Sequence, residues 1–409
     1  MSTVPGPPGV AACSGADAPC RKLRVLFFVE GFTDIRFVSG LSEICDLTLA
    51  VSGPAFHRDG LADRLAQRSV PITVAEIAGG RLAFQARSFG YLWRRARDFD
   101  VILSQEVLRG SLNATVVGAL RGVPVVTYMG ISPIEYFRCR RERRQIGWFT
   151  ALAGETIIGV LMRVNGFLAT RCVAMGPYLR GVAARYCRRT EIGLYYGVDT
   201  EYFRPVDSAE RIELRRKCGL PPDRFLIFLS SRISHEKDPE TVIRATSLAR
   251  KQGLDAVLLN ASGGYEQFLR LARDLGVPAD ADWLIGRPAA HPMTEVGDYF
   301  RAADVMALAS LAEGAAYSTL EALACGTPVV ATAVGGMAVQ LDGYARLTPR
   351  SDPQAMANAF VWVAQHQEEA RTQALRGRVY VQREWERRKA FADLNALLQT
   401  LANAGPVDP

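Results

Sequence analysis

The stretch AEGAAYSTLEALACGTPVVATAVGG (Ala312–Gly336) decides the fold of this chain. The apolar run before it, VMALAS, is typical of a buried parallel strand, and TLEALACG predicts a helix that ends at Gly326. Two carboxylates, Glu313 and Glu321, lie eight residues apart around this junction. Open α/β sheets bind ligands at the carboxyl ends of their strands, and the start of a helix favours phosphate. The stretch therefore predicts a site for a polyhydroxylated ligand.

Outward from this stretch, short apolar runs alternate with helical patterns. The predicted strands are residues 22–32, 46–52, 69–77, 99–106 and 123–130 in the first half, and 225–232, 256–263, 282–287, 303–310 and 327–332 in the second. Alternation of this kind argues for parallel, doubly wound sheets. The predicted fold class is therefore α/β.

Two domains are expected, because 409 residues exceed what one hydrophobic core usually supports. Gly and Pro interrupt LYYGVDTEYFRP (Leu194–Pro205), which predicts a hinge before a second β-α series that begins at Asp223. The expected division is a disordered tail (1–22), a first domain (23–200), a second domain (201–385), and a last helix and tail (386–409) that packs back on the first domain.

The net charge of +7 is unevenly placed. Residues 1–200 hold 25 Lys and Arg against 16 Asp and Glu, which gives +9. A basic half of this size suits a nucleotide, an anionic substrate or a membrane surface, or it serves only solubility. No nucleic-acid partner is expected, because aromatic and basic readers are not interleaved.

The eight cysteines show no C-x-x-C spacing and no cluster with His at zinc spacing. They are expected to be reduced thiols of a cytoplasmic protein. The first residues, MSTVPGPPGVAACSGADAPC, lack the charged and apolar regions of a signal peptide, so export is not expected.

Five motifs stand in the order found in one enzyme family. They are GVDTEYFRP (197–205), SRISHEKDPETVIRA (231–245), LIGRP (284–288), the two-Glu segment, and GTPVVATAVGG (326–336). Together they cover most of residues 190–345, and the pattern resembles the retaining glycosyltransferases of family 4, also described as group 1. The resemblance implies a GT-B fold, in which two Rossmann-like, doubly wound domains face each other across a nucleotide-sugar cleft.

The resemblance assigns a basic pair to the donor phosphates. Arg232 and Lys237 match the residues that bind the diphosphate of a sugar nucleotide and stabilise its charge as it leaves. An Arg fork after a strand and a Lys in the next loop suit this task, although two solvated surface charges are the alternative. With Glu313, they are the predicted catalytic residues.

The two glutamates match hydroxyl-binding positions. Glu321 corresponds to the family residue that accepts hydrogen bonds from the ribose, and Glu313 to the one that contacts the transferred sugar. The alternatives are a helix-capping acid for Glu313 and a solvated helix face for Glu321. Backbone amides of Gly314, Ala315 and Ala316 are predicted to cradle sugar or phosphate. The family often has E-G-F-G where this chain has E-G-A-A-Y.

Other positions match more loosely. Gly31, after the first predicted strand, and Arg287, in LIGRP, are counted among the donor-binding residues. A glycine there lets backbone approach the donor, but tight turns also use glycine. At the end of VPVVTYMG many relatives have a His that approaches the sugar, and this chain has Tyr128 and Met129 instead. That departure is the main argument for a noncatalytic relative.

The implied reaction moves a sugar from a nucleoside diphosphate to an acceptor hydroxyl with retention of configuration. The resemblance implies a front-face mechanism without a protein nucleophile, without a metal, and without a cofactor besides the nucleotide sugar. Asp280-Ala281-Asp282 lies in a polar loop and is interpreted as a turn.

Two basic segments bear on the acceptor. In FRCRRERRQIGWFTALAGETIIGVLM (137–162) arginines precede an apolar run, and residues 81–97 combine arginines with aromatic residues. The arginines of the first segment are Arg138, Arg140, Arg141, Arg143 and Arg144. Both segments suit an anionic membrane at the inner face of the cell membrane; alternatively, their apolar faces pack in the first domain.

Three functions stay open. The chain is a cytoplasmic or peripheral-membrane transferase acting on a lipid-linked or cell-envelope glycan, or it serves a soluble acceptor with the same chemistry. The third is a noncatalytic relative that binds sugar nucleotide without turnover.

Overall fold

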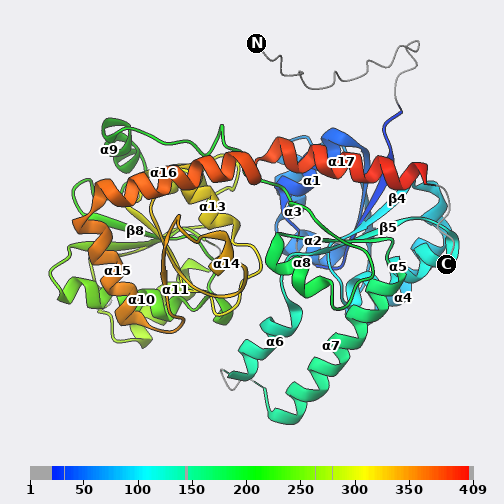
Figure 1. Cartoon of the computed structure of the whole chain (residues 1–409), viewed down its shortest axis with the longest axis horizontal. Coiled ribbons are helices and arrows are strands. Elements are labelled where there is room, and N and C mark those ends of the chain that lie inside the picture. Colours follow the sequence, from blue (N-terminus) through cyan, green and yellow to red (C-terminus); the bar gives the residue numbers. More distant parts are fainter. Residues whose placement is uncertain (1–20, 32, 143–145, 263, 279, 405–409) are drawn as a thin grey trace, which may run out of the picture.

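Two parallel sheets, each with helices around it, form the molecule (Figure 1). The computed structural model describes residues 21–31, 33–142, 146–262, 264–278 and 280–404. The predicted tail up to Cys20, with Cys13, lies outside these residues, as do Arg143 and Arg144. Six further cysteines are described, and all are free thiols.

The first domain is built on a seven-stranded sheet of order β3-β2-β1-β4-β5-β6-β7. Its strands are β1 (Arg24–Val29), β2 (Asp46–Ser52), β3 (Thr73–Ile77), β4 (Val101–Ser104), β5 (Val125–Met129), β6 (Arg171–Ala174) and β7 (Thr190–Ile192). Its helices are α1 (Ile35–Ile44), α2 (Gly53–Arg58), α3 (Leu61–Gln67), α4 (Arg81–Arg95), η1 (Ala96–Asp98), α5 (Arg109–Arg121), α6 (Pro133–Glu142), α7 (Trp148–Leu168) and α8 (Pro177–Ala183).

The second domain has a six-stranded sheet of order β10-β9-β8-β11-β12-β13. Its strands are β8 (Phe225–Leu229), β9 (Ala256–Asn260), β10 (Leu284–Gly286), β11 (Val305–Leu308), β12 (Val329–Thr332) and β13 (Arg346–Thr348). Its helices are α9 (Ser208–Lys217), η2 (His235–Lys237), α10 (Pro239–Lys251), α11 (Tyr265–Asp274), α12 (Val296–Ala302), α13 (Tyr317–Ala324), α14 (Gly335–Gln340), α15 (Pro353–Gln365) and α16 (Gln367–Glu384).

Both sheets reverse their strand order in the middle. The reversal lies between β1 and β4 in the first sheet and between β8 and β11 in the second. Connections leave toward opposite faces at such a point, which opens a crevice at the carboxyl ends of the two central strands. The fold therefore places one ligand crevice in each domain.

The predicted strands are all present. Most are apolar runs buried on both faces, whereas the edge strands β3 and β10 are partly exposed. In β1, for example, Val25 and Phe27 belong to one apolar core and Leu26 and Phe28 to another, on opposite faces of the sheet. The prediction missed β6, β7 and β13. Each has three or four residues that include Arg, Thr or Glu (RCVA, TEI and RLT), so no apolar run marks them.

The chain crosses between the domains twice, at adjacent places. Val198 donates its N–H to the Trp385 carbonyl at 2.7 Å and accepts from Arg387 N–H at 3.0 Å. Gly197 has a φ of +64°, and a Cβ there would lie 2.5 Å from the Arg387 Cα. Glycine is therefore required where the two crossings touch.

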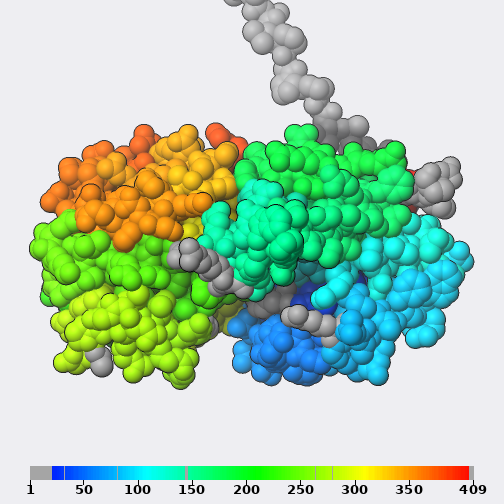
Figure 2. Space-filling view, turned by 90° about the horizontal axis from the view of Figure 1, so that it is seen from below, coloured from blue at the N-terminus to red at the C-terminus, as the bar shows by residue number. Residues whose placement is uncertain are grey.

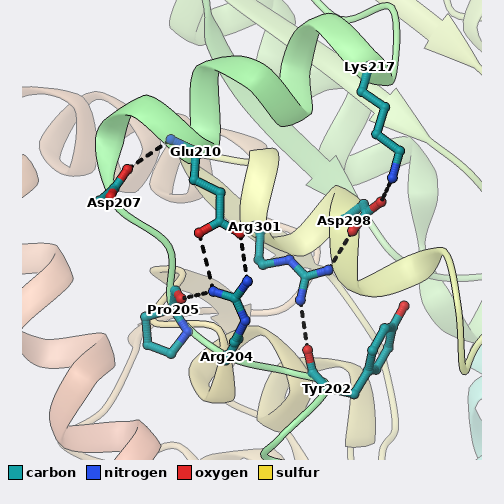
Figure 3. A network of polar contacts seen from close by, with 8 residues as sticks. All are labelled: Tyr202, Arg204, Pro205, Asp207, Glu210, Lys217, Asp298 and Arg301. Carbon is teal, nitrogen blue, oxygen red and sulfur yellow. Dashed lines mark hydrogen bonds and ion pairs between the residues drawn. The ribbon is translucent and has the colours of Figure 1, made fainter.

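Ion pairs fix the chain just after the first crossing (Figure 3). Arg301 of α12 donates to the Tyr202 carbonyl at 2.7 Å and pairs with Asp298. Arg204 pairs with Glu210 of α9 at 2.7 Å. These contacts attach the crossing segment to the second domain.

The last helix, α17 (Arg387–Asn403), returns to the first domain, and in Figure 1 it continues the line of α16 over the top of the molecule. Its Phe391 ring occupies the space that a Cβ at Gly40 of α1 would need. The ring is buried and stacks near Phe37, with ring centroids 6.2 Å apart. Apolar packing thus holds α17 on α1.

We expect Phe391→Ala to lower the free energy of unfolding by about 3 kcal/mol, because it empties a packed site between α1 and α17. Urea denaturation followed by circular dichroism measures the loss. Thr400→Ala, an exposed position on the same helix, should change stability by less than about 0.5 kcal/mol. Equal midpoints for Phe391→Ala and the native chain would contradict this packing role.

Candidate active site

The crevice of the second domain gathers the predicted donor residues. Arg232 follows β8, and Glu313 follows β11, which is the neighbouring strand. Adjacent strands lie about 4.8 Å apart. The sheet therefore brings the two loops to one place at the strand reversal.

Lys237 and Glu313 form an ion pair in this crevice. Lys237 is the last residue of η2, and its Nζ contacts Glu313 Oε2. Ser310 donates its hydroxyl to the same oxygen at 3.0 Å. Since Glu313 is only 8% exposed, this is a buried charge pair and not a helix-capping acid. The crevice thus holds a cation and a hydroxyl-accepting carboxylate within contact of each other.

Arg232 lies differently. Its side chain is exposed, and its guanidinium pairs with Glu236 at 3.3 Å. The structure therefore brings Lys237 to Glu313 but places Arg232 beside Glu236, four residues along the same loop.

Glu321 meets the first domain. It lies on α13, which ends at Ala324 and is followed, after Cys325, by a left-handed glycine, Gly326 (φ +68°). Arg36 of α1 contacts Glu321 Oε1 with its Nη1. Burial raises the pKa of Glu321 to about 7 against the opposing charge of Arg36. Glu321 is consequently a buried charge at the domain interface and not part of a solvated helix face.

Three groups hold Arg36 in place. Asp34 accepts from its Nη2 at 2.7 Å, the Tyr196 hydroxyl lies 2.8 Å from the same nitrogen, and the guanidinium covers the Tyr196 ring at 4.1 Å. Burial opposes the charge of Arg36, but Asp34 and Glu321 outweigh it and hold the pKa of Arg36 well above its usual value. Arg36 is therefore positively charged in the ion pair that joins the two domains.

Glycines let the domains approach at the donor loop. A Cβ on Gly314 would lie 2.5 Å from the Gly130 carbonyl, which follows β5 of the first domain. A Cβ on Gly336 would meet the Gly314 carbonyl, and Gly336 N–H donates to the Glu313 carbonyl at 2.9 Å. Backbone packing alone thus fixes the Glu313–Gly314 loop.

Two further predicted residues have other partners. The Ala316 amide donates to Gln340 Oε1 at 3.2 Å, so of the three predicted cradle amides this one is already bonded within the protein. Ala315 packs beside the same apolar core. Arg287 donates to the Gly219 carbonyl at 3.3 Å. It follows β10, three strand positions from β11, or about 14 Å, and so lies apart from the Lys237–Glu313 pair.

The first domain has its own cavity of about 390 Å³ at its strand reversal. Gly31 lines it, and a Cβ there would meet no atom within 4 Å. Tyr128 and Met129, which stand where relatives have a His, also line it. Glu30 and Glu106 add two carboxylates. Burial, followed by the charge of Glu30, raises the pKa of Glu106 to about 7.

Sequence reasoning missed Arg36, Glu30 and Glu106. Arg36 has a local signal, since Asp-x-Arg at the start of a helix after a glycine loop places a cation beside the crevice. Glu30 and Glu106 each follow a predicted strand directly. The rule that strand ends bind ligands identifies both.

A metal site finds little support in the part of the chain that is described. No three His, Cys, Asp or Glu residues come together there in a way that could hold an ion. Asp282, in the predicted turn, is exposed and pairs with Arg224 at 3.0 Å.

Fold and crevice define a GT-B protein, with charged residues of the second domain facing the first across a cleft. Residues 210–378, most of the second domain, match the family model described as glycosyl transferases group 1. The second domain is thus similar to the group 1 glycosyltransferases.

Named relatives align over parts of the chain. D-inositol 3-phosphate glycosyltransferase 1 of Catenulispora acidiphila is 29% identical over 306 residues, which cover 72% of this chain and 67% of the relative. D-inositol 3-phosphate glycosyltransferase of Mycobacterium bovis is 38% identical over 148 residues, 35% of this chain and 29% of that protein. The chain thus matches less than a third of the mycobacterial relative.

Solved structures show the same fold over the whole molecule. Anabaena HepE in complex with UDP-glucose has a TM-score of 0.70 at 18% identity, covering 92% of this chain and all of that one. WaaG, a glycosyltransferase involved in lipopolysaccharide biosynthesis, has a TM-score of 0.64 at 13% identity, covering 94% and 100%.

We expect Arg36→Met to lower the free energy of unfolding by about 3 kcal/mol at pH 8, because Glu321 loses its partner while buried. The loss should be smaller at pH 6. Burial raises the pKa of Glu321 to about 7 even beside Arg36, and removal of Arg36 raises that pKa further. At pH 6 the carboxyl is therefore protonated in both folded proteins, and the two differ in stability mainly as the pH rises above that value.

Urea denaturation at both pH values measures this difference. The matched control is Arg36→Met combined with Glu321→Gln, which also leaves Asp34 unpaired but removes the buried charge. It should recover stability at pH 8 and flatten the pH dependence. A greater loss at pH 6 than at pH 8 would refute the assignment.

We expect Gly336→Ala to destabilise the second domain by about 2 kcal/mol, because the new methyl overlaps the Gly314 carbonyl. The matched control is Gly181→Ala on α8, where an added Cβ meets nothing within 4 Å. Thermal unfolding compares the two, and equal melting temperatures would show that the donor loop has room to move.

Proposed function

We propose that this chain transfers a sugar from a nucleoside diphosphate sugar to an acceptor hydroxyl, with retention of configuration. The contact between Lys237 and Glu313 at the strand reversal carries the proposal. A cation beside a hydroxyl-accepting carboxylate suits a sugar attached to a diphosphate.

Each residue has a proposed role. Lys237 binds the diphosphate and stabilises its charge as the leaving group departs, with Arg232 swinging in from its exposed position. Glu313 binds hydroxyls of the transferred sugar. Glu321 binds the ribose with one carboxylate oxygen while Arg36 holds the other, since a carboxylate offers two acceptors. The leaving phosphate, and no protein nucleophile or metal, assists deprotonation of the acceptor.

The first-domain cavity is the proposed acceptor site. Gly130 borders both this cavity and Gly314 of the donor loop, so an acceptor there lies next to the transferred sugar. Glu30 and Glu106 are able to accept hydrogen bonds from its hydroxyls. We further propose that the protein acts at the cytoplasmic face of a membrane, on a lipid-linked or cell-envelope glycan.

A soluble acceptor is the second candidate. Two aligned relatives are D-inositol 3-phosphate glycosyltransferases, and a cavity of about 390 Å³ accommodates a molecule of that size. A noncatalytic sugar-nucleotide-binding protein is the third candidate, for which Tyr128 and Met129 in place of a His are the argument.

A thermal-shift panel with UDP, GDP, ADP and their sugar conjugates tests donor binding. A ligand that binds only the folded state raises the melting temperature. One nucleotide series should stabilise the native chain, and Glu321→Gln should reduce the shift. Glu369→Gln, an exposed position on α16, is the control and should keep it. A folded native chain that no nucleotide stabilises would sink the transferase proposal.

Turnover separates an enzyme from a noncatalytic binder. With the donor that the panel selects, we expect Lys237→Ala to lower kcat about 100-fold, because it removes a charge that stabilises the departing phosphate. Lys251→Ala, exposed at the end of α10, is the control. Proton NMR of the product reports the anomeric configuration, and inversion would refute the proposed mechanism.

A further inference from the structure

The outward face of α7 is apolar. Its exposed large side chains include Phe149, Leu152, Ile157, Val160, Val164 and Phe167, of which Phe149 is 78% and Phe167 61% exposed. They recur at helical spacing, with Thr150, Thr156 and Arg163 as the exposed polar residues between them. A surface helix of a globular protein ordinarily turns polar residues outward. This helix has the reverse arrangement.

The inward face of α7 is fully engaged. Ala151 and Met162 are buried, and α7 packs along α5 and α6. Asn165, also buried, accepts from the Thr115 hydroxyl at 2.8 Å and donates to the Leu108 carbonyl at 3.0 Å. Phe137 of α6 fills the space beside Gly154. These contacts fix the orientation of α7, and its exposed apolar residues consequently point outward.

The sequence of the α6–α7 hairpin has a net positive charge. Residues 133–168 contain six Arg and three Glu, a net charge of +3. Arg138 and Arg141 bridge to Glu155 and brace the hairpin. At the other end Arg188 covers the Phe167 ring at 4.8 Å. Apolar residues flanked by arginines complement a surface that is anionic outside and apolar beneath.

Aromatic residues mark the end of α7 nearest its turn with α6. Trp148 and Phe149 are both exposed, with ring centroids 4.5 Å apart. Trp favours the boundary between lipid headgroups and acyl chains.

The arginine-rich helix α4 differs from α7. Its Phe84 and Leu92 are buried against the sheet, and Arg121 covers the Trp93 ring at 5.1 Å. The sequence indicates two segments that could bind a membrane. Because α4 packs its main apolar face against the first-domain core, α7 is the better candidate.

We propose that the α6–α7 hairpin binds an anionic lipid bilayer with the outward face of α7 inserted between the headgroups. Within the described residues, α7 is the helix whose length and composition suffice to cross a membrane. Its bonds to α5 hold it along the domain, so the proposed mode is insertion parallel to the surface.

The hairpin lies beside the proposed active site. α6 begins at Pro133, which lines the first-domain cavity, and α6 packs against η2, the helix that ends at Lys237. Figure 1 shows the hairpin projecting from the first domain, and in Figure 2 its green atoms reach toward the second. A bilayer on α7 therefore lies one helix, α6, away from η2. The membrane contact rests on the hairpin alone, and delivery of a lipid acceptor rests on the proposed function.

Vesicle flotation with the full chain tests the proposal. Vesicles of phosphatidylcholine mixed with phosphatidylglycerol should carry the protein upward at about 0.1 M salt, less at about 0.5 M, and vesicles of phosphatidylcholine alone should carry little. Phe149→Ser combined with Phe167→Ser should weaken partitioning at least about tenfold, because two apolar side chains leave the bilayer.

Val379→Ser on α16 is the matched control, since that side chain is apolar and 62% exposed but lies in the second domain. It should float like the native chain. Leu82, on α4, is 86% exposed, and the Leu82→Ser variant should also float. If this variant no longer floats while the Phe149/Phe167 variant does, α4 is the membrane-binding helix, and the proposal is overturned. Failure of the native chain to float, or equal flotation of the Phe149/Phe167 variant, overturns it as well.

Light scattering tests whether a second copy of this chain, instead of a membrane, covers the outward face of α7. A dimer of the native protein that the Phe149/Phe167 variant dissociates would show that α7 covers itself, and would overturn membrane binding. Donor binding is measured by thermal shift without vesicles, so the two tests are independent. A missing thermal shift would contradict the proposed transferase activity but not the membrane binding shown by flotation.

Discussion

The ion pair of Arg36 with Glu321 is the constraint on which the cleft depends. One charge comes from α1 of the first domain and the other from α13 of the second. A buried charge is tolerated when its partner is present and is strongly destabilising without it. The domains therefore meet in a register that neutralises both, and Asp34 and Tyr196 keep the guanidinium aimed at that register.

Backbone contact supplies what charge alone does not. An ion pair of long side chains permits some sliding, but the approach of Gly314 to Gly130 and of Gly336 to Gly314 leaves no side chain to compress. Glu313 belongs to this loop, and its carboxylate holds Lys237 of η2 by an ion pair. The charged atoms of the second domain are thus held by main chain, which suits a site that must present fixed charges to a substrate.

Most of the architecture could be predicted from the sequence, because buried parallel strands are recognisable as apolar runs. The strands that carry Arg232 and Glu313 were placed correctly, and with them the crevice. Contacts across the domains were not accessible in this way. Arg36 lies 285 residues from Glu321, and nothing local to either residue encodes how two separately folded sheets are oriented. Similarly, residues 81–97 and 137–162 both combine arginines with apolar residues, and only packing shows that Phe84 is buried while Phe149 is exposed.

The paired crossings at Val198 and Trp385 make the second domain an insertion within the first. Because α17 belongs to the first domain, a single cut of the chain at either crossing does not separate the two domains. Two neighbouring tethers joined by hydrogen bonds resist separation and shear but permit rotation about the line through them. Movement between the domains is thereby reduced to one principal degree of freedom, a rotation about that axis.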